Sequence, residues 1–397
     1  MQIWGYPLKI ITKYLDYLNF IIMRNKTTYV CTLMLTHGCN LNCVYCFEKF
    51  KDIKKNMTFE TAQQIINKEV KRFYESNKEG QLKFDFFGGE PLLRFPLIQQ
   101  VCMWAWEQNF PVPITFSITT NGTLLDENKK DWLRQHKDKI RLIMSVDGMD
   151  DTQGANRGCH INMDAMTFLF ETWPDTHVKA TASKESIHSF GEGIVYWLKQ
   201  GKQVEASFGV GVDWSKEDAD AYKRALEIVG DYYLEHMDIK PMGILMYPYT
   251  RLLEPFCNQI PPLNCGIERS MILYDYDGKE YPCHLFLPIV HGDKDVKDYL
   301  NTISWKTPER FWEGECKECE LRQICRTCYG FNYTQRDDVA NRDKRLCNML
   351  LAEAQIGSQF QINYYMKLST NRELTTEELL YLQAALVCYE KFKNFSF

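Results

Sequence analysis

Three cysteines in the stretch "THGCNLNCVYCFE" are the side chains best suited to chemistry. Cys39, Cys43 and Cys46 lie close together, and the stretch supplies no fourth cysteine. Structural zinc sites and simple electron-transfer clusters usually take four protein ligands. Three thiolates on a cubane iron–sulfur cluster leave one iron without a protein ligand, and catalytic metal sites keep such a position open for a substrate or cofactor. Zinc, or three buried thiols that meet by chance, is the alternative.

The elements that must position these cysteines are short β-rich runs that alternate with helical segments. The six predicted strands are residues 28–36, 82–87, 114–119, 140–146, 177–182 and 204–212. Strand–helix alternation predicts parallel strands with right-handed crossovers. Six units are fewer than the eight of a closed barrel. We therefore expect an α/β fold with a partial (β/α)6 TIM-like barrel, whose active site lies at the C-terminal strand ends, where the cysteine loop also begins.

Changes in hydrophobic periodicity and cysteine content along the sequence predict four regions. An amphipathic helical extension over 1–27 precedes the barrel over 28–237, and a loop-rich, cysteine-rich segment follows over 238–348. That segment has little periodic apolar sequence, so we expect metal to organise it. C-terminal helices are predicted over 349–397, where Thr375 and Glu378 form a capping-box pattern.

Composition limits the classes of function. The 47 basic and 52 acidic residues give a net charge of -5 without a basic stripe, which disfavours a nucleic-acid partner. No apolar run is long enough to span a bilayer, so no membrane partner is expected. The fifteen cysteines are clustered in a long chain without a signal-peptide pattern, which predicts a reducing, cytoplasmic compartment and cysteines that serve as ligands.

The cysteine loop resembles a known family signature. Cys39-x3-Cys43-x2-Cys46, with Tyr45 before the last cysteine, is similar to the motif of radical S-adenosylmethionine (radical SAM) enzymes. In that family the methionine moiety of S-adenosylmethionine chelates the open iron of a [4Fe–4S] cluster. The resemblance implies reductive cleavage of this cofactor to a 5′-deoxyadenosyl radical, which abstracts a hydrogen from the substrate.

The strand ends continue this resemblance. The stretch "FFGGEPLL" matches the motif that lies against the methionine amino group, and glycine suits a close approach of backbone to ligand. Serine and arginine at the spacing of "SVDG" and "GANRG" hold the cofactor carboxylate in related enzymes, as a guanidinium fork suits a carboxylate. The alternative for Asn121 is an ordinary Asn-Gly turn, and the alternative for Arg157 is a solvated charge in a loop. The implied cofactor-binding residues beside Tyr45 are Gly88, Gly89, Glu90, Pro91, Thr120, Asn121, Ser145, Asp147 and Arg157.

The C-terminal cysteines resemble the SPASM extension, which holds two further [4Fe–4S] clusters, so that three clusters are implied. The family's interleaved pattern assigns one auxiliary cluster to Cys257, Cys265, Cys283 and Cys328, and the other to Cys316, Cys319, Cys325 and Cys347. The spacing before Cys328 is one residue shorter than usual, and Cys257 is the weakest assignment. Two CxxC pairs also suit zinc. The remaining thiols, Cys31, Cys102, Cys159 and Cys388, match no motif, and we expect them to be buried or incidental, with Cys159 the one to test for reactivity.

Two substrate classes are compatible with this resemblance. Anaerobic sulfatase-maturating enzymes, which oxidise Cys or Ser to formylglycine, carry an aspartate base after the cysteine that matches Cys283, whereas this chain has His284. The stretch "YPCH" looks more like thioether-forming maturases of ribosomal peptides, with carbon–carbon crosslinks as a variant. We expect His284 to act as a base or as a hydrogen-bond donor to the cluster.

The expected partners follow from this interpretation. They are a precursor peptide and a reducing electron donor of the flavodoxin or ferredoxin type. The residues before the first strand are too few for a winged-helix module, so leader recognition is expected to use a separate leader-binding protein, the helical N-terminus or the C-terminal helices. A hypothesis of another class is a non-catalytic iron–sulfur or zinc-organised binding protein.

Overall fold

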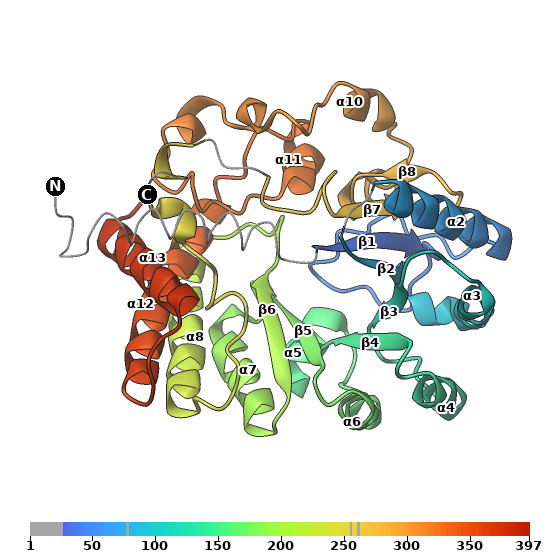
Figure 1. Ribbon diagram of the computed structural model, residues 1–397, viewed down its shortest axis with the longest axis horizontal. Helices are drawn as coiled ribbons and strands as arrows, with labels where there is room; N and C mark the ends of the chain where they lie inside the picture. Colours follow the sequence, from blue (N-terminus) through green and yellow to red (C-terminus); the bar gives the residue numbers. More distant parts are fainter. Residues whose placement is uncertain (1–26, 77–78, 255, 260–262) are drawn as a thin grey trace.

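A computed structural model of the chain (Figure 1) describes residues 27–76, 79–254, 256–259 and 263–397. The helical extension predicted over 1–27 lies outside the described residues, except for Thr27. Within the described ranges, the chain has no helix with the length and apolar character to cross a membrane.

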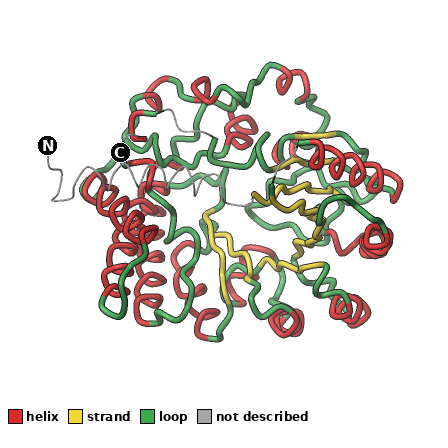
Figure 2. Tube along the Cα trace, in the orientation of Figure 1, coloured by secondary structure: helices red, strands yellow, loops and turns green. Residues whose placement is uncertain are grey.

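One eight-stranded sheet forms the centre of the molecule. Its strand order is β6-β5-β4-β3-β2-β1-β7-β8, in which β7 is parallel to β1 and β8 is antiparallel to β7. The strands are β1 (Thr27–Met34), β2 (Gly80–Phe87), β3 (Ile114–Thr120), β4 (Ile140–Ser145), β5 (His177–Ala182), β6 (Gln203–Phe208), β7 (Met271–Tyr274) and β8 (Glu280–Tyr281). The sheet is curved but not closed (Figures 1 and 2), and the predicted partial barrel is confirmed.

Helices cover the outer face of this curved sheet (Figure 1). They are α2 (Phe59–Glu75), α3 (Phe95–Glu107), α4 (Glu127–Gln135), α6 (Met163–Thr172), α7 (Phe190–Lys199) and α8 (Lys216–Glu235). The short helix α5 (Asp150–Arg157) follows β4 and lies against the cysteine loop, where the Asn156 carbonyl accepts the Val44 amide. Side chains along each strand point alternately to the two faces of the sheet, so one set is buried under the helices and the other faces the inside of the barrel. In β2, Leu82, Phe84 and Phe86 are buried in the main core, while Lys83 and Asp85 point to the inner face, the barrel lumen.

The segment after α8 joins the sheet instead of standing apart from it. β7 pairs with β1 from Val30↔Met271 to Leu33↔Tyr274. A second core lies below it, built from residues such as Leu273, Phe286 and Leu287. The segment therefore packs more extensively than its sequence pattern indicates, because its strands and helices are too short to show a period.

The remaining helices enclose the C-terminal part. They are α9 (Pro288–His291), α10 (Lys297–Asn301), α11 (Tyr329–Arg336), α12 (Leu346–Ser369) and α13 (Thr376–Phe392). α12 and α13 pack beside α8 on one side of the molecule (Figure 1). The capping box predicted at Thr375 and Glu378 is present at the start of α13.

The sixth strand is shorter than the sequence indicates. β6 ends at Phe208, whereas the sequence pattern predicts a strand that continues to Val212. Gly211 has a φ of 88°, and a Cβ on it would lie 2.5 Å from the ring of Phe331. The chain therefore turns at this glycine and passes close to α11, which shapes the mouth of the barrel.

Candidate functional site

The cysteine loop begins at the C-terminal end of β1 and is held by the Gly-Gly turn that follows β2. The amide of Gly89 donates to the Thr36 carbonyl (3.1 Å), and the amide of Glu90 donates to the Gly38 carbonyl (2.9 Å). A Cβ on Gly89 would lie 2.3 Å from that Gly38 oxygen. Gly89, which the sequence places close to a ligand, is thus required for the close approach of the backbone at Gly38, next to Cys39.

The three thiols of this loop are free and partly exposed. The Leu41 amide donates to Cys39 Sγ (3.4 Å), and burial raises the pKa of the Cys39 thiol to about 11. Burial also raises the pKa values of Cys43 and Cys46. Thiols of this kind lose the proton when a metal takes its place, since the thiolate is the ligand.

His37, just before Cys39, belongs to no motif that the sequence reveals. Its ring is fully buried, and Nε2 lies 2.7 Å from Oδ1 of Asp275, which follows β7. This contact joins the start of the cysteine loop to the end of β7, which pairs with β1 on the edge opposite β2. Only the three-dimensional pairing of β1 with β7 brings the two residues together.

Glu90 is buried and accepts three hydrogen bonds. Its donors are the Thr120 hydroxyl (2.6 Å), the Asn121 amide (2.9 Å) and the Leu92 amide (3.0 Å). It also caps the short helix Pro91–Arg94, with Pro91 at its first position. The carboxylate thus fastens the end of β2 to the end of β3. Burial nevertheless leaves its pKa above the usual value.

The side chain of Asn121 connects the end of β3 to the cysteine loop. Its Nδ2 donates to Oδ1 of Asn40 (3.0 Å), and Nδ2 of Asn40 donates to the Thr123 hydroxyl (2.8 Å). The family resemblance points to Asn121 but not to Asn40 or Thr123. A polar residue inside the cysteine motif is the one available signal for Asn40.

Asp147 and Arg157 form a buried ion pair at the end of β4. Nε and Nη2 of Arg157 donate to the two carboxylate oxygens at 2.8 and 3.0 Å. The Tyr45 hydroxyl and the Thr181 amide also donate to Asp147. The fork of Arg157, expected at a cofactor carboxylate, is therefore occupied by a protein carboxylate. The guanidinium carbon also lies 5.5 Å from the centroid of the Tyr45 ring.

Ser145 ends β4 on the lumen side and pairs in register with Lys179 of β5. Its neighbours Leu142 and Met144 are buried in the main core. No hydrogen bond of the Ser145 hydroxyl occurs within the described part of the chain, so this donor is available to a ligand.

His284 lies where the barrel meets the cysteine-rich segment. Its ring makes edge contacts with Phe87 at the end of β2 (4.8 Å between centroids) and with Phe47 of the cysteine loop (6.2 Å). Burial, together with the charge of Lys179, lowers its pKa to about 4. The imidazole is therefore neutral at physiological pH.

Three of the four cysteines expected at the first auxiliary cluster lie together. Cys265, Cys283 and Cys328 belong to the same packed cluster beneath β7, and their sulfurs are close enough for their charges to interact. Cys257 is not part of this group. Its thiol donates to the Glu254 carboxylate, and its carbonyl accepts from Nε2 of Gln323 (2.6 Å).

The other auxiliary set comes together completely. Its four cysteines line one small cavity; they are Cys316, Cys319, Cys325 and Cys347. Arg342 Nη1 donates to Cys325 Sγ (3.7 Å), while its guanidinium stacks on Trp312 at 3.8 Å. No sequence signal points to this arginine, because it is a neighbour of the sulfurs only in the fold. In the described residues, no three His, Cys, Asp or Glu side chains are grouped so as to hold a single metal ion.

The four motif-free thiols are isolated side chains. Cys31, Cys102 and Cys388 are fully buried. Cys159 accepts a hydrogen bond from Nε2 of Gln153 (3.8 Å), and burial raises its pKa. A raised pKa lowers the thiolate fraction, so the structure gives no reason for special reactivity at Cys159.

A buried carboxyl oxygen beside the cysteine loop has no protein partner. Glu48 is 6% exposed, and its Oε1 forms no hydrogen bond to any described residue. Burial raises the pKa of this carboxyl to about 8, although the nearby charge of Lys51 acts to lower it. An orphaned acceptor next to three cysteines fits a ligand that brings a positive charge, for example an amino group. The thiols, the glycine turn and this oxygen are together compatible with a cluster and a zwitterionic amino-acid cofactor.

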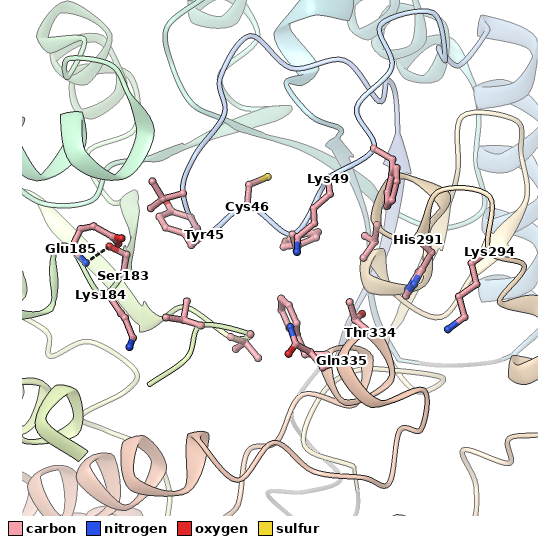
Figure 3. A pocket seen from close by; sticks show the side chains of 18 residues that line it. Tyr45, Cys46, Lys49, Ser183, Lys184, Glu185, His291, Lys294, Thr334 and Gln335 are labelled. Carbon is pink, nitrogen blue, oxygen red and sulfur yellow. Dashed lines mark hydrogen bonds between the residues drawn. The ribbon is translucent and has the colours of Figure 1, made fainter. Parts of the chain in front are cut away.

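A cavity of about 440 Å³ opens at the mouth of the barrel (Figure 3). Figure 3 shows Tyr45, Cys46 and Lys49 of the cysteine loop on one wall and Thr334 and Gln335 of α11 opposite. The loop after β5 and the end of α9 complete the lining with Ser183, Lys184, Glu185, His291 and Lys294. The cavity therefore joins the cysteine loop to the C-terminal segment.

Comparison with known proteins identifies the domain. Residues 33–167 match the model of the Radical SAM superfamily, which implies a [4Fe–4S] cluster and S-adenosylmethionine. The chain is 30% identical over 126 residues to a cysteine-type anaerobic sulfatase-maturating enzyme of Clostridium perfringens, which covers 30% of this chain and 33% of that protein. The matched regions span between 26% and 38% of the first three curated relatives.

Solved structures share the fold over most of the chain. The structure of anSMEcpe with bound AdoMet and the Kp18Cys peptide has a TM-score of 0.64 at 17% identity and covers 87% of this chain and 99% of that one. Streptococcus suis SuiB bound to the precursor peptide SuiA has a TM-score of 0.53 at 15% identity, with 87% and 82% covered. With the motif residues gathered at the strand ends, residues 33–167 carry a domain of the radical SAM superfamily.

Proposed function

We propose that this chain is a radical SAM peptide maturase, which abstracts hydrogen from a ribosomally made peptide to install a crosslink. The observation that carries the proposal is the cavity of about 440 Å³, because it has Cys46 in one wall and the auxiliary-cysteine segment in the other. A peptide side chain in this cavity would lie beside both. The bond we favour is a cysteine thioether, with a carbon–carbon bond as the variant.

The cofactors would be held by the residues already described. Cys39, Cys43 and Cys46 would bind the first cluster, and the glycine turn after β2 would line the methionine moiety of the cofactor. When bound, the cluster and S-adenosylmethionine supply a 5′-deoxyadenosyl radical that can remove an unactivated hydrogen. The auxiliary cysteines would hold two further [4Fe–4S] clusters. Because the Cys257 thiol contacts Glu254, Cys265, Cys283 and Cys328 would hold one of these clusters with three thiolates.

The chain's own residues position the reaction and exclude water. Phe47 and Phe87 contact the ring of His284, and Phe331 packs on Phe47. We infer that the neutral imidazole of His284 accepts the proton of the substrate thiol, next to Cys283, which would help to hold an auxiliary cluster. This role rests on its place between the cysteine loop and Cys283.

Structural neighbours that bind peptides support a peptide substrate. SuiB is bound to its precursor peptide SuiA, and anSMEcpe is bound to the Kp18Cys peptide. A reducing electron donor of the flavodoxin or ferredoxin type, a leader-binding protein and a cytoplasmic location complete the proposal as predictions from the sequence.

The first experiment tests cofactor cleavage. Anaerobically reconstituted protein should release 5′-deoxyadenosine when S-adenosylmethionine and dithionite are added. Cys43→Ala should abolish this product and retain roughly two thirds of the iron, since the auxiliary cysteines are intact. Zinc instead of iron in the wild-type protein, or no 5′-deoxyadenosine from a fully loaded protein, would favour a non-catalytic binding protein.

The second experiment identifies the reaction on the peptide. The peptide encoded beside this gene should lose two hydrogens and gain a cysteine that iodoacetamide no longer alkylates, as measured by mass spectrometry. The rival function is sulfatase maturation, which the similarity to the Clostridium perfringens enzyme favours. Conversion of the cysteine of a sulfatase-derived peptide to an aldehyde, with no change in the peptide encoded beside the gene, would establish sulfatase maturation instead.

A further inference from the structure

Arg342 is a buried cation that no part of the proposed function uses. Its side chain is 8% exposed and lines the small cavity between α11 and α12. Nη1 donates to Cys325 Sγ (3.7 Å), and Nη2 donates to the Phe311 carbonyl (2.7 Å). The complete auxiliary set, which lines the same cavity, consists of Cys316, Cys319, Cys325 and Cys347.

The protein groups in contact with this guanidinium carry no negative charge of their own. Beside the Phe311 carbonyl, the rings of Trp312 and Tyr329 lie 3.8 and 5.8 Å from the guanidinium carbon. Nε of Arg342 is buried and has no hydrogen-bond partner among the described residues. A buried charge without a counter-charge is strongly unfavourable, so a cation in this place requires an anion close by.

The carboxylate next to Arg342 in the chain is bound by other arginines. Asp343 is 5% exposed and also lines the cavity. It forms ion pairs with Arg336 (3.4 Å) and Arg345 (2.7 Å). No carboxylate of the described ranges forms an ion pair with Arg342. The sulfurs of the cavity are therefore the groups that can supply the negative charge.

Arg342 is close enough to these sulfurs to favour their ionised forms. Burial raises the pKa values of the Cys316 and Cys325 thiols, and the charge of Arg342 acts to lower both again. Cysteine ligates metal as the thiolate, so a cluster with four thiolates would bring an anion to this cation. The buried guanidinium and the four cysteines thus fit a metal-bound state of the complete auxiliary set.

We propose that Arg342 is the counter-cation of the cluster held by the complete auxiliary set and raises the reduction potential of that cluster. This inference rests on the proposed function, which includes the cluster. One-electron reduction adds one negative charge without a proton, so a nearby cation stabilises the reduced form more than the oxidised form. Arginine suits this position because it stays charged and stacks on Trp312 while its Nη1 reaches a sulfur.

The test measures the midpoint potential of this cluster by anaerobic redox titration, followed by electron paramagnetic resonance. The signal of the reduced protein that is absent from Cys347→Ala identifies the cluster. Arg342→Gln keeps a hydrogen-bond donor and removes the charge. Its midpoint should become more negative by about 59 mV or more, which is a tenfold change in a one-electron equilibrium. Arg342→Lys keeps a charge and should shift by less than half as much.

Lys344→Met is the matched control. The charge of Lys344 also acts on Cys316 and Cys347, but this lysine is 64% exposed and paired with Glu315. Water screens an exposed charge, so its removal should leave the midpoint at the wild-type value. Iron analysis of every variant reports whether the cluster is present.

Three results would overturn the inference. They are a wild-type midpoint in Arg342→Gln, an equal shift in Lys344→Met, and loss of this cluster from both Arg342 variants, which would show that the side chain only shapes the cavity. Loss of the cluster from Arg342→Gln alone would support the inference, because the charge in Arg342→Lys then retains it. Zinc or no metal at the complete auxiliary set of the wild type would refute the proposed function as well, whereas iron with an unchanged midpoint refutes this inference alone.

Discussion

At the scale of single residues, two buried carboxylates of the family motifs are already bound by donors of the protein itself, without any ligand. Glu90 fastens β2 to β3, and Asp147 gathers Arg157, Tyr45 and the Thr181 amide at the end of β4. Buried carboxylates are tolerated only when donors or cations satisfy them. The strand ends are thus fixed independently of the cofactor, which prepares the site for it.

The Asp147–Arg157 pair should be measurable as stability. Asp147→Asn removes the charge that balances the buried guanidinium, and we expect the free energy of unfolding to fall by about 3–5 kcal/mol in urea titrations. The double variant Asp147→Asn with Arg157→Met should recover part of this loss, because no unpaired charge remains. A loss below about 1 kcal/mol in the single variant would contradict a tightly coupled pair.

Motif residues are predictable from the sequence, but their contacts are not. The spacing of Cys39, Cys43 and Cys46 is local, so the sequence alone locates the loop that carries them. His37 and Arg342 acquire their roles from partners far along the chain. The occupied fork of Arg157 likewise depends on a pairing that only folding creates.

At the scale of elements, the Gly-Gly turn acts as a template for the cysteine loop. Gly89→Ala should displace the backbone at Gly38, since the added methyl group would lie 2.3 Å from its oxygen. We expect roughly a third of the iron to be lost, corresponding to the first cluster, with the auxiliary clusters retained. Iron and sulfide analysis after anaerobic purification measures this.

Gly154→Ala is the matched control for that experiment. Gly154 lies in α5, and a Cβ on it would have no heavy atom within 4 Å. Its iron content should equal that of the wild type, and its stability should rise slightly. Equal iron in the two variants would show that the turn does not shape the loop.

The cap of α13 allows a prediction about pH. The side chain of Thr375 accepts from the Glu378 amide, and Glu378 reciprocates at the Thr375 amide. Thr375→Ala should cost about 1 kcal/mol, measured by hydrogen exchange of α13 amides. The Arg372 guanidinium lowers the pKa of Glu378 to about 2. A carboxyl group whose pKa is lowered by folding stabilises the protein at pH values above its pKa in the unfolded chain. This stabilisation is lost as the pH falls through its pKa in the folded protein. The difference in stability between the wild type and Thr375→Ala should therefore be constant between about pH 5 and 8.

Elements are predicted best where they are long and periodic. The five strands from β1 to β5 and α2, with Ile65, Ile66, Val70 and Phe73 buried, agree with the pattern. β7 and β8 have only four and two residues, too few for a period to appear. The sequence pattern puts the end of β6 too late, because Gly211 and the approach of α11 override the β propensity of its valines.

At the scale of the whole molecule, the two auxiliary cysteine sets differ in completeness. Cys265→Ala should lose roughly a third of the iron, because Cys265 lies with Cys283 and Cys328. Cys257→Ala should retain the wild-type iron content, because its thiol is turned toward Glu254. Iron analysis of both variants, compared with Cys347→Ala as a four-cysteine reference, measures the difference. Equal losses at Cys257 and Cys265 would restore the four-ligand assignment of the family pattern.

The pairing of β7 with β1 has a consequence for dissecting this protein. β1 is bonded on both edges, to β2 and to β7, and His37 meets Asp275 just beyond. A fragment that stopped after α8 would strip one edge of β1 and leave a row of unpaired amides and carbonyls beneath the cysteine loop. Such bare edges recruit strands from other molecules. The N-terminal half should therefore precipitate when it is expressed alone, and a soluble fragment will have to retain the chain through Tyr281.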